Sequence, residues 1–297
     1  MRRAVALLIT LFFIMLISIS VGIGLKQVNE ASAHVKGEKF LYQSSVILED
    51  VISILNNAQE LKDINSSEGL ALFLSESSFI PFQAQGIQVS IELSSARAKF
   101  NVNSLVDENH KANTQRVASL KQYMSNYMVI TTYVDILLDA MSGIKDDMSY
   151  NSDIFNTKVD LFRDYIASKK HLDELNEYYT SYYHEYSLKN IEFEKLFSYS
   201  TDKNYKIDLS FATPEVWELM IGCDKQRAVE LSSNFYTSKD EIGLSKEEQK
   251  RLENFSTTLF EKFLEVSINI SQDKHSANIK FEYDIQNAKG SNFVYEI

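Results

Sequence analysis

Cysteine, proline and glycine are all scarce in this sequence, and each shortage excludes a class of structure. A single cysteine, Cys223, excludes an internal disulfide, so the fold must rely on its hydrophobic core. Two prolines and nine glycines in 297 residues are too few for a chain that is mainly flexible linker. Hydrophobic residues make up 44% of the chain, which is enough for one large core or two smaller ones.

Basic residues and catalytic motifs are also in short supply. The 30 Lys and Arg residues are outnumbered by 41 Asp and Glu residues, and this net charge of −11 argues against nucleic acid as a partner. The sequence has no HExxH motif, no Gly-x-Ser-x-Gly elbow and no phosphate-binding loop. Its five histidines are scattered, at His34, His110, His171, His184 and His275. We therefore expect a protein that is not an enzyme.

One long apolar segment is present, close to the N-terminus. Residues 4–25 carry no charge, and a helix of this length, rising about 1.5 Å per residue, spans the hydrocarbon layer of a membrane. Arg2 and Arg3 precede it and are expected to hold the N-terminus in the cytoplasm. This predicts a single-pass protein of the bacterial inner membrane with its C-terminal domain in the periplasm. The alternative is a signal peptide cleaved after Ala31-Ser32-Ala33.

Helical spacing continues beyond the apolar segment. Residues 26–64 contain no proline and only one glycine. The apolar face predicted for this segment consists of Leu41, Ser45, Leu48, Ile52 and Leu55, broadened by Val51 and Ile54. We therefore expect the membrane helix to continue as an amphipathic helix packed on a globular head.

Alternating apolar residues predict strands in two separate parts of the chain. In the first part, Ile87, Val89, Ile91 and Leu93 alternate with polar residues, and residues 98–102 predict the second arm of a hairpin. In the second part, residues 264–270, 279–285 and 293–297 predict a three-stranded antiparallel meander.

The residues between these two blocks are predominantly helical in pattern. Helices are predicted at residues 113–140, 156–167, 172–186 and 193–197. A helical block that splits a sheet predicts an α+β fold: a long N-terminal transmembrane and amphipathic helix, then an antiparallel sheet interrupted by a large helical inserted domain. The aromatic stripe Tyr178, Tyr179, Tyr182, Tyr183 and Tyr186 is typical of core packing with some surface hydroxyls, and a partner-facing patch is the alternative.

The first residues resemble the start of a type IV pilin-like prepilin. Met-Arg-Arg-Ala-Val-Ala-Leu-Leu-Ile-Thr-Leu places a very short basic leader ahead of the apolar helix. In that family a prepilin peptidase cuts after a small residue, usually Gly, and methylates the new N-terminus, which implies cleavage between Ala4 and Val5. The fifth mature residue is usually Glu, and here it is Ile9. Within the family, this absence resembles the large minor pseudopilin of type II secretion, the K-type subunit.

Three internal segments extend the resemblance over most of the chain. Residues 99–105 resemble the strand that leads into the insert of the K-type subunit, residues 134–150 its Asp-rich segment, and residues 206–216 the segment that returns from the insert. The expected organisation is a leader at 1–4, a transmembrane helix at 5–25 and its periplasmic continuation at 26–64. The first part of the sheet is expected at 76–106, the inserted α-domain at 107–201, a return segment and helical hairpin at 202–255, and the C-terminal strands at 256–297.

The resemblance implies a structural function. A K-type subunit is a minor pseudopilin that caps or initiates the periplasmic pseudopilus of a type II (general) protein secretion system. Its partners would be other minor pseudopilins, contacted through the N-terminal helix and the sheet domain, together with the prepilin peptidase and the inner membrane. Ile9 fits a filament tip, because a carboxylate buried in lipid needs an amine from a neighbouring subunit above it.

Two further expectations accompany this interpretation. Calcium occurs in the K-type family, and Asp146, Asp147 and Asp153 are candidate Ca²⁺ ligands, although their spacing is not that of a twelve-residue calcium loop. No cofactor is required. The alternative function is a membrane-anchored periplasmic sensory, ligand-binding or adaptor domain.

Overall fold

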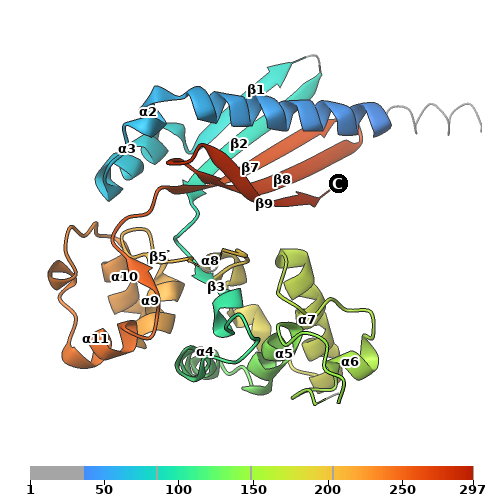
Figure 1. Ribbon diagram of the computed structural model, residues 1–297, viewed down its shortest axis with the longest axis vertical. Coiled ribbons are helices and arrows are strands. Elements are labelled where there is room, and N and C mark those ends of the chain that lie inside the picture. Colours follow the sequence, from blue (N-terminus) through green and yellow to red (C-terminus); the bar gives the residue numbers. More distant parts are fainter. Residues whose placement is uncertain (1–36, 85, 148, 203, 297) are drawn as a thin grey trace, which may run out of the picture.

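The computed structural model describes residues 37–84, 86–147, 149–202 and 204–296 (Figure 1). This part of the chain mixes helices with an antiparallel sheet, which confirms the predicted α+β class. The main sheet has five strands in the order β1-β2-β7-β8-β9, and every neighbouring pair is antiparallel. The strands are β1 (Phe79–Ala84), β2 (Ile87–Ser95), β7 (Phe263–Gln272), β8 (His275–Asp284) and β9 (Lys289–Glu296).

The two predicted strand blocks lie side by side in this sheet. In β2 and β7, Val89 pairs with Ile270 and Ile91 with Ile268, so apolar residues face the same side across the pair. Their side chains are buried, and the residues between them are mostly polar and accessible. One apolar face and one polar face follow from this alternation.

A helix at residues 37–57 covers the apolar face of the sheet (Figure 1). Phe40, Leu48, Val51 and Leu55 are buried in the core that the helix shares with the strands. The helix stops at Ala58 and is followed by α2 (Gln59–Lys62) and α3 (Ser67–Ser77).

The apolar face predicted for this helix was partly wrong. Leu41 is 42% exposed and Ile54 is 65% exposed, while Phe40 and Ser44 are buried. The sheet covers a face that is rotated around the helix from the predicted one, so Phe40 and Ser44 are buried while Leu41 and Ile54 lie at its margins. The ring of Phe40 stacks on His275 of β8, with 5.6 Å between centroids, which ties the start of the described helix to the β7–β8 turn.

The predicted hairpin formed by residues 87–93 and 98–102 was also wrong. The partner of β2 on its outer side is β1, and the chain leaves the sheet after β2. Beyond it, β3 (Phe100–Asn101) pairs in parallel with β4 (Phe197–Ser198) and runs into a 3₁₀ turn, η1 (Val102–Leu105). A second short parallel pair joins β5 (Ile207–Asp208) and β6 (Thr257–Thr258).

The segment between β2 and β7 forms a helical lobe on the side of the sheet away from the N-terminal helix (Figure 1). Its first helices are α4 (Thr114–Asn126), α5 (Thr132–Ala140), α6 (Ile154–Thr157), α7 (Lys169–Tyr183), η2 (Ser187–Asn190) and α8 (Phe193–Leu196). The single helix predicted at 113–140 is thus two helices, separated by Met128 in a left-handed conformation (φ 64°) and by a β-branched run that follows it. The helix predicted at 156–167 is only the single turn of α6.

The lobe is completed by α9 (Pro214–Ile221), α10 (Lys225–Ser232), η3 (Asp240–Ile242) and α11 (Lys246–Leu252). The hydroxyl of Thr213 accepts the N–H of Val216, and Pro214 occupies the first helical position, so α9 begins with a strong start signal. Gly222 ends α9 with φ 69°, and a side chain there would collide with the guanidinium of Arg251.

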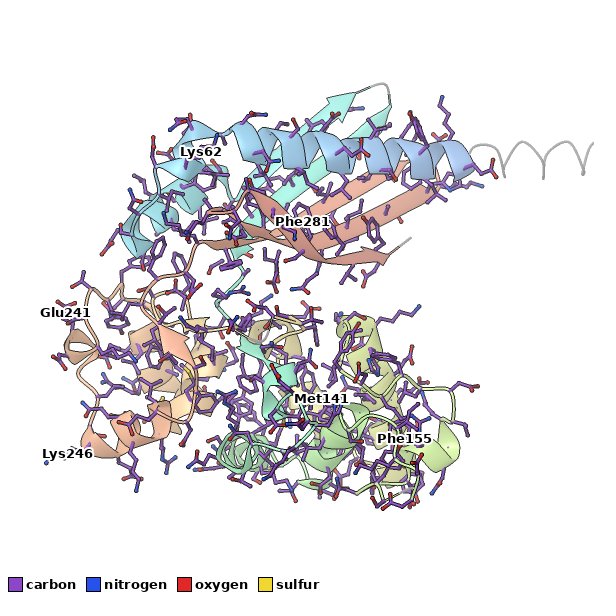
Figure 2. The ribbon with its side chains drawn as sticks, in the orientation of Figure 1. Lys62, Met141, Phe155, Glu241, Lys246 and Phe281 are labelled. Atoms are coloured by element: carbon purple, nitrogen blue, oxygen red, sulfur yellow. The ribbon has the colours of Figure 1, made fainter. Side chains whose placement is uncertain are left out.

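The described residues form two separate hydrophobic cores (Figure 2). One lies between the N-terminal helix and the sheet and includes Phe281. The other fills the helical lobe and includes Met141 and Phe155. The second core extends from Phe100 to Phe255, so α9, α10 and α11 share it with the helices at 107–201.

Asp208 is a buried carboxylate at the base of the helical lobe. Its two oxygens accept the backbone N–H groups of Ser210 and Glu261, each at 3.0 Å. Burial raises the pKa of Asp208 from 3.8 to about 7, against the opposing effect of these N–H bonds. The folded protein therefore holds a proton here between about pH 4 and pH 7 that the unfolded chain has lost.

We expect Asp208 to make stability fall as the pH rises from about 4 to about 7. Because the pKa of Asp208 is higher in the folded protein than in the unfolded chain, the stabilisation is complete below the unfolded pKa and is lost as the pH passes the folded pKa; it is worth up to about 4 kcal/mol. Asp208→Asn should flatten this part of the profile, measured by urea unfolding across the pH range. Asn leaves one N–H donor without an acceptor at every pH and therefore lowers the free energy of unfolding throughout. The readout is the slope of this free energy against pH, and not its absolute value. Parallel profiles for parent and variant would contradict the assignment.

Candidate functional site

The residues predicted for processing lie outside the described part of the chain. Ala4, Val5 and Ile9 precede residue 37, as does the apolar segment at 4–25. Among the described residues, no helix is both long enough and apolar enough to span a membrane. The structural surfaces that bear on function are therefore those of the helix, the sheet and the helical lobe.

Four large apolar residues of the N-terminal helix are exposed: Leu41, Tyr42, Val46 and Ile54. At about 100° per residue, Tyr42 and Val46 lie one turn apart on the side opposite the sheet, while Leu41 and Ile54 lie at the two margins of the covered side. We call Tyr42 and Val46 the free helix face, a pair of exposed apolar side chains that a protein contact would bury. The carboxylates of Glu49 and Asp50 are exposed on the same helix and add negative charge beside this face.

The two edge strands expose further apolar residues. On β1, Phe79, Ile80 and Phe82 are exposed, and on β9 Phe293 and Tyr295 are exposed. Pro81 lies in the middle of β1 and has no N–H, so this edge cannot present a continuous row of donors to an added strand. The β1 edge therefore favours side-chain contacts over strand addition.

Arg97 occupies the junction between the two cores. It lies two residues after the end of β2 and is only 1% exposed. Its Nη1 donates to Glu282 of β8 at 2.8 Å and its Nη2 to Asp202 at 3.2 Å. The guanidinium lies over the rings of Phe263 and Tyr205, 3.9 and 4.4 Å from their centroids. One cation therefore contacts β8, the start of β7 and the segment that returns from the helical lobe.

Other polar contacts surround Arg97 at the same junction. The hydroxyl of Tyr205 donates to the carbonyl oxygen of Lys99 at 2.7 Å, and Lys99 Nζ lies 3.1 Å from Glu265 Oε1. Asn292 of β9 donates to Ser200 Oγ at 2.9 Å and accepts from the hydroxyl of Thr201. The lobe is thus attached to the sheet by hydrogen bonds and ion pairs.

The three calcium candidates are placed on the surface of the helical lobe. Asp146 and Asp147 lie in an exposed turn, where hydrogen bonds from Ser149 lower the pKa of Asp147. Asp153 precedes α6 and accepts from Asn156 and from the hydroxyl of Tyr182, each at 3.1 Å. The part of the chain that the structure describes contains no group of three His, Cys, Asp or Glu side chains arranged to hold a metal ion. Calcium binding stays a sequence prediction.

Asp139, which was not predicted from the sequence, organises the same loop. It is fully buried at the end of α5. Its Oδ1 accepts the backbone and side-chain N–H groups of Asn151, and its Oδ2 accepts the N–H and hydroxyl of Ser152, at 2.7–3.0 Å. A signal was present, because Asp139 lies three residues after Ile136 on the apolar side of its helix.

The tyrosine stripe on α7 has both buried and exposed members. Tyr178 and Tyr179 are buried in the core of the lobe, as the core interpretation predicts. The hydroxyl of Tyr179 accepts the N–H of Ile130 at 3.3 Å. Tyr182 is exposed on α7, and Tyr186, which lies beyond the end of α7 and precedes η2, is also exposed. The helix therefore mainly packs the lobe and leaves Tyr182 at its surface.

We expect Arg97→Met to destabilise the protein by about 3–5 kcal/mol, because it leaves the carboxylate of Glu282 buried without a partner. The double variant Arg97→Met/Glu282→Gln should recover part of this loss. Lys99→Met is the matched control: it breaks the more exposed pair with Glu265 and should cost at most about 1 kcal/mol. Urea unfolding of the three variants gives the free energies. Equal losses for Arg97→Met and Lys99→Met would show that the buried cation has no special role at the junction.

The fold and its surfaces can be compared with those of known proteins. No protein-family model matches the sequence, and no curated protein matches it significantly. Among solved structures, the fold is similar to a chain in the crystal structure of the GspK–GspI–GspJ complex from the type 2 secretion system of enterotoxigenic Escherichia coli. The TM-score is 0.56 at 11% sequence identity, over 90% of this chain and 98% of that chain. The sheet, its covering helix and the helical lobe thus make up a fold that a component of this secretion-system complex shares.

Proposed function

We propose that the protein is a minor pseudopilin that assembles with smaller pseudopilins at the tip of a type II secretion pseudopilus. The observation that carries the proposal is the fold match to a chain of the GspK–GspI–GspJ complex, which covers nearly all of both chains. The N-terminal sequence, with its short basic leader before an apolar helix, supports it independently.

The free helix face supplies a surface for such partners. The helix uses Phe40, Leu48, Val51 and Leu55 to pack on its own sheet. Tyr42 and Val46 point away from that core and are exposed. A second helix that packed along this side would bury these apolar side chains, which is the usual source of affinity between amphipathic helices. Other minor pseudopilins therefore bind through the N-terminal helix, with the sheet edges beside it.

The helical lobe favours a tip position over a shaft position. The lobe is inserted between β2 and β7, and its core holds 40 buried apolar residues among those described, against 20 in the core of the sheet domain. A shaft subunit repeats the same head-to-tail contact above and below itself, and a lobe of this size obstructs such repetition. The apolar residue Ile9 is consistent with a tip position. A tip subunit has no neighbour above it whose amine would pair with a buried carboxylate, and Ile9 carries none.

The remaining steps of the proposal concern the membrane. The chain is stored in the inner membrane through residues 4–25, with its C-terminal domain in the periplasm. A prepilin peptidase cuts between Ala4 and Val5 and methylates the new N-terminus. The role is structural, and neither catalysis nor a cofactor is part of it.

We expect Val46→Glu to reduce co-purification with the smaller pseudopilins by about tenfold or more, because a carboxylate would be buried between two helices without a partner. Val229→Glu is the matched control: Val229 is also an exposed valine on a helix, on α10 in the helical lobe, and should leave the complex unchanged. Unchanged complex for Val46→Glu, with a normal unfolding midpoint, would remove the free helix face from the proposal.

We expect Ile9→Glu to give less complex than the parent. An unpaired carboxylate near the bilayer centre costs about 2.5–3.5 kcal/mol, which shifts an equilibrium by about a hundredfold. The measurement is crosslinked complex per unit of membrane protein, with Ile9→Leu as the control for side-chain shape. At a shaft position a neighbouring amine would offset the charge, so more complex in Ile9→Glu than in the parent would move this subunit from the tip into the shaft.

A further inference from the structure

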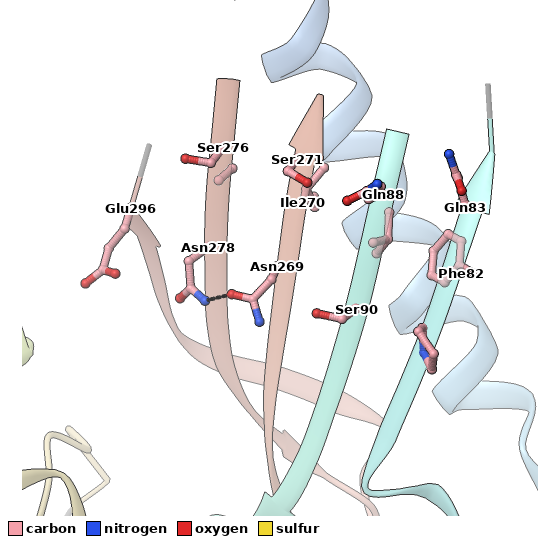
Figure 3. A pocket seen from close by; sticks show the side chains of 13 residues that line it. Phe82, Gln83, Gln88, Ser90, Asn269, Ile270, Ser271, Ser276, Asn278 and Glu296 are labelled. Atoms are coloured by element: carbon pink, nitrogen blue, oxygen red, sulfur yellow. Dashed lines mark hydrogen bonds between the residues drawn. The ribbon is translucent and has the colours of Figure 1, made fainter. Parts of the chain in front are cut away.

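A shallow groove of about 770 Å³ crosses the polar face of the sheet, on the side away from the N-terminal helix (Figure 3). The strand register arranges its lining residues in two straight rows. The first row crosses all five strands and consists of Pro81, Ser90, Asn269, Asn278 and Glu296. The second row crosses four strands and consists of Gln83, Gln88, Ser271 and Ser276.

The groove presents amide and hydroxyl groups that the protein itself does not use. Within the described residues, no hydrogen bond engages the side chains of Gln83, Gln88, Ser90, Ser271 or Ser276. The amide of Asn278 donates to Asn269 Oδ1, which fixes the orientation of this central pair (Figure 3). The described lining contains no Lys or Arg, and Glu296 is its one acidic residue.

This composition differs from that of the rest of the same face. The neighbouring depression, closer to the helical lobe, is lined by the charged residues Glu92, Glu265 and Lys280. Asn and Ser are also poor strand formers compared with Thr, Val or aromatic residues. Uncharged short side chains are therefore concentrated at one end of the face, where they cost strand stability and offer free donors and acceptors.

We propose that this groove binds a neutral oligosaccharide. Amides and hydroxyls both donate and accept hydrogen bonds, which matches a ligand whose surface is covered by hydroxyl groups. Pro81 lines the β1 end of the groove and supplies apolar surface for the C–H face of a sugar ring. A charged ligand would find no cation here, and an extended peptide would need apolar pockets or a free strand edge. The inference is independent of the proposed function.

The test uses the full-length chain in lipid nanodiscs with two neutral probes, chitohexaose and maltohexaose, measured by calorimetric titration. We expect saturable binding of at least one probe. Gln88→Ala and Ser271→Ala should each weaken it by about two- to tenfold, the effect of losing one hydrogen bond. Ser271→Arg, which fills the groove from an exposed position, should abolish it. Asn57→Ala removes an exposed amide from the N-terminal helix, on the other side of the sheet, and should leave binding unchanged.

Three results would overturn the proposal. The first is no saturable binding of either probe at millimolar concentration by a parent protein with a normal unfolding transition. The second is binding that Ser271→Arg leaves intact, which would place the sugar elsewhere. The third is a change in self-association or in pseudopilin co-purification caused by Ser271→Arg, which would make the groove a protein interface.

Discussion

The arrangement of this protein depends on one buried guanidinium between two hydrophobic cores that do not merge. The chain leaves the sheet after β2 and returns at β7, and the residues in between form a core of their own. Arg97 lies at this crossing, paired with Glu282 and Asp202 and stacked between Tyr205 and Phe263. A planar cation suits this place because it can pair in its plane and stack on its faces at once, which a lysine cannot do.

The division into two separate cores explains which features could be predicted from the sequence. The sheet has one apolar side, so β2, β7, β8 and β9 carry a two-residue alternation that is visible without any structure. The helical lobe is likewise visible as a block without that alternation. Thr213 and Pro214 mark the start of α9 through local chemistry alone. Signals that arise within a few residues were therefore predictable, and so were the fold class and the order of its parts.

Features that depend on distant residues were not predictable. Strand β1 contains Pro81 and has apolar side chains on both sides, so it lacks the alternating pattern of its partner β2. Met128 interrupts the predicted helix without glycine or proline, and its residue type does not signal the left-handed conformation that it adopts. Arg97 forms hydrogen bonds with residues that lie 105 and 185 positions further along the chain, and no local sequence pattern predicts these contacts. On the N-terminal helix, periodicity predicted one apolar face, and only contact with the sheet determined which residues are covered.

That last point connects the fold to its function. A helix whose only apolar residues cover a sheet has none left for contact with a partner. Here Phe40 and Leu48 pack on the sheet, while Tyr42 and Val46, on the opposite side of the helix, stay exposed at the surface. The helical lobe leaves these residues open, because it is attached on the opposite side of the sheet through the Arg97 junction (Figure 1). A buried cation that fixes the lobe on one side therefore also preserves the free helix face on the other, and the lobe adds bulk to the protein without covering the surface proposed for its partners.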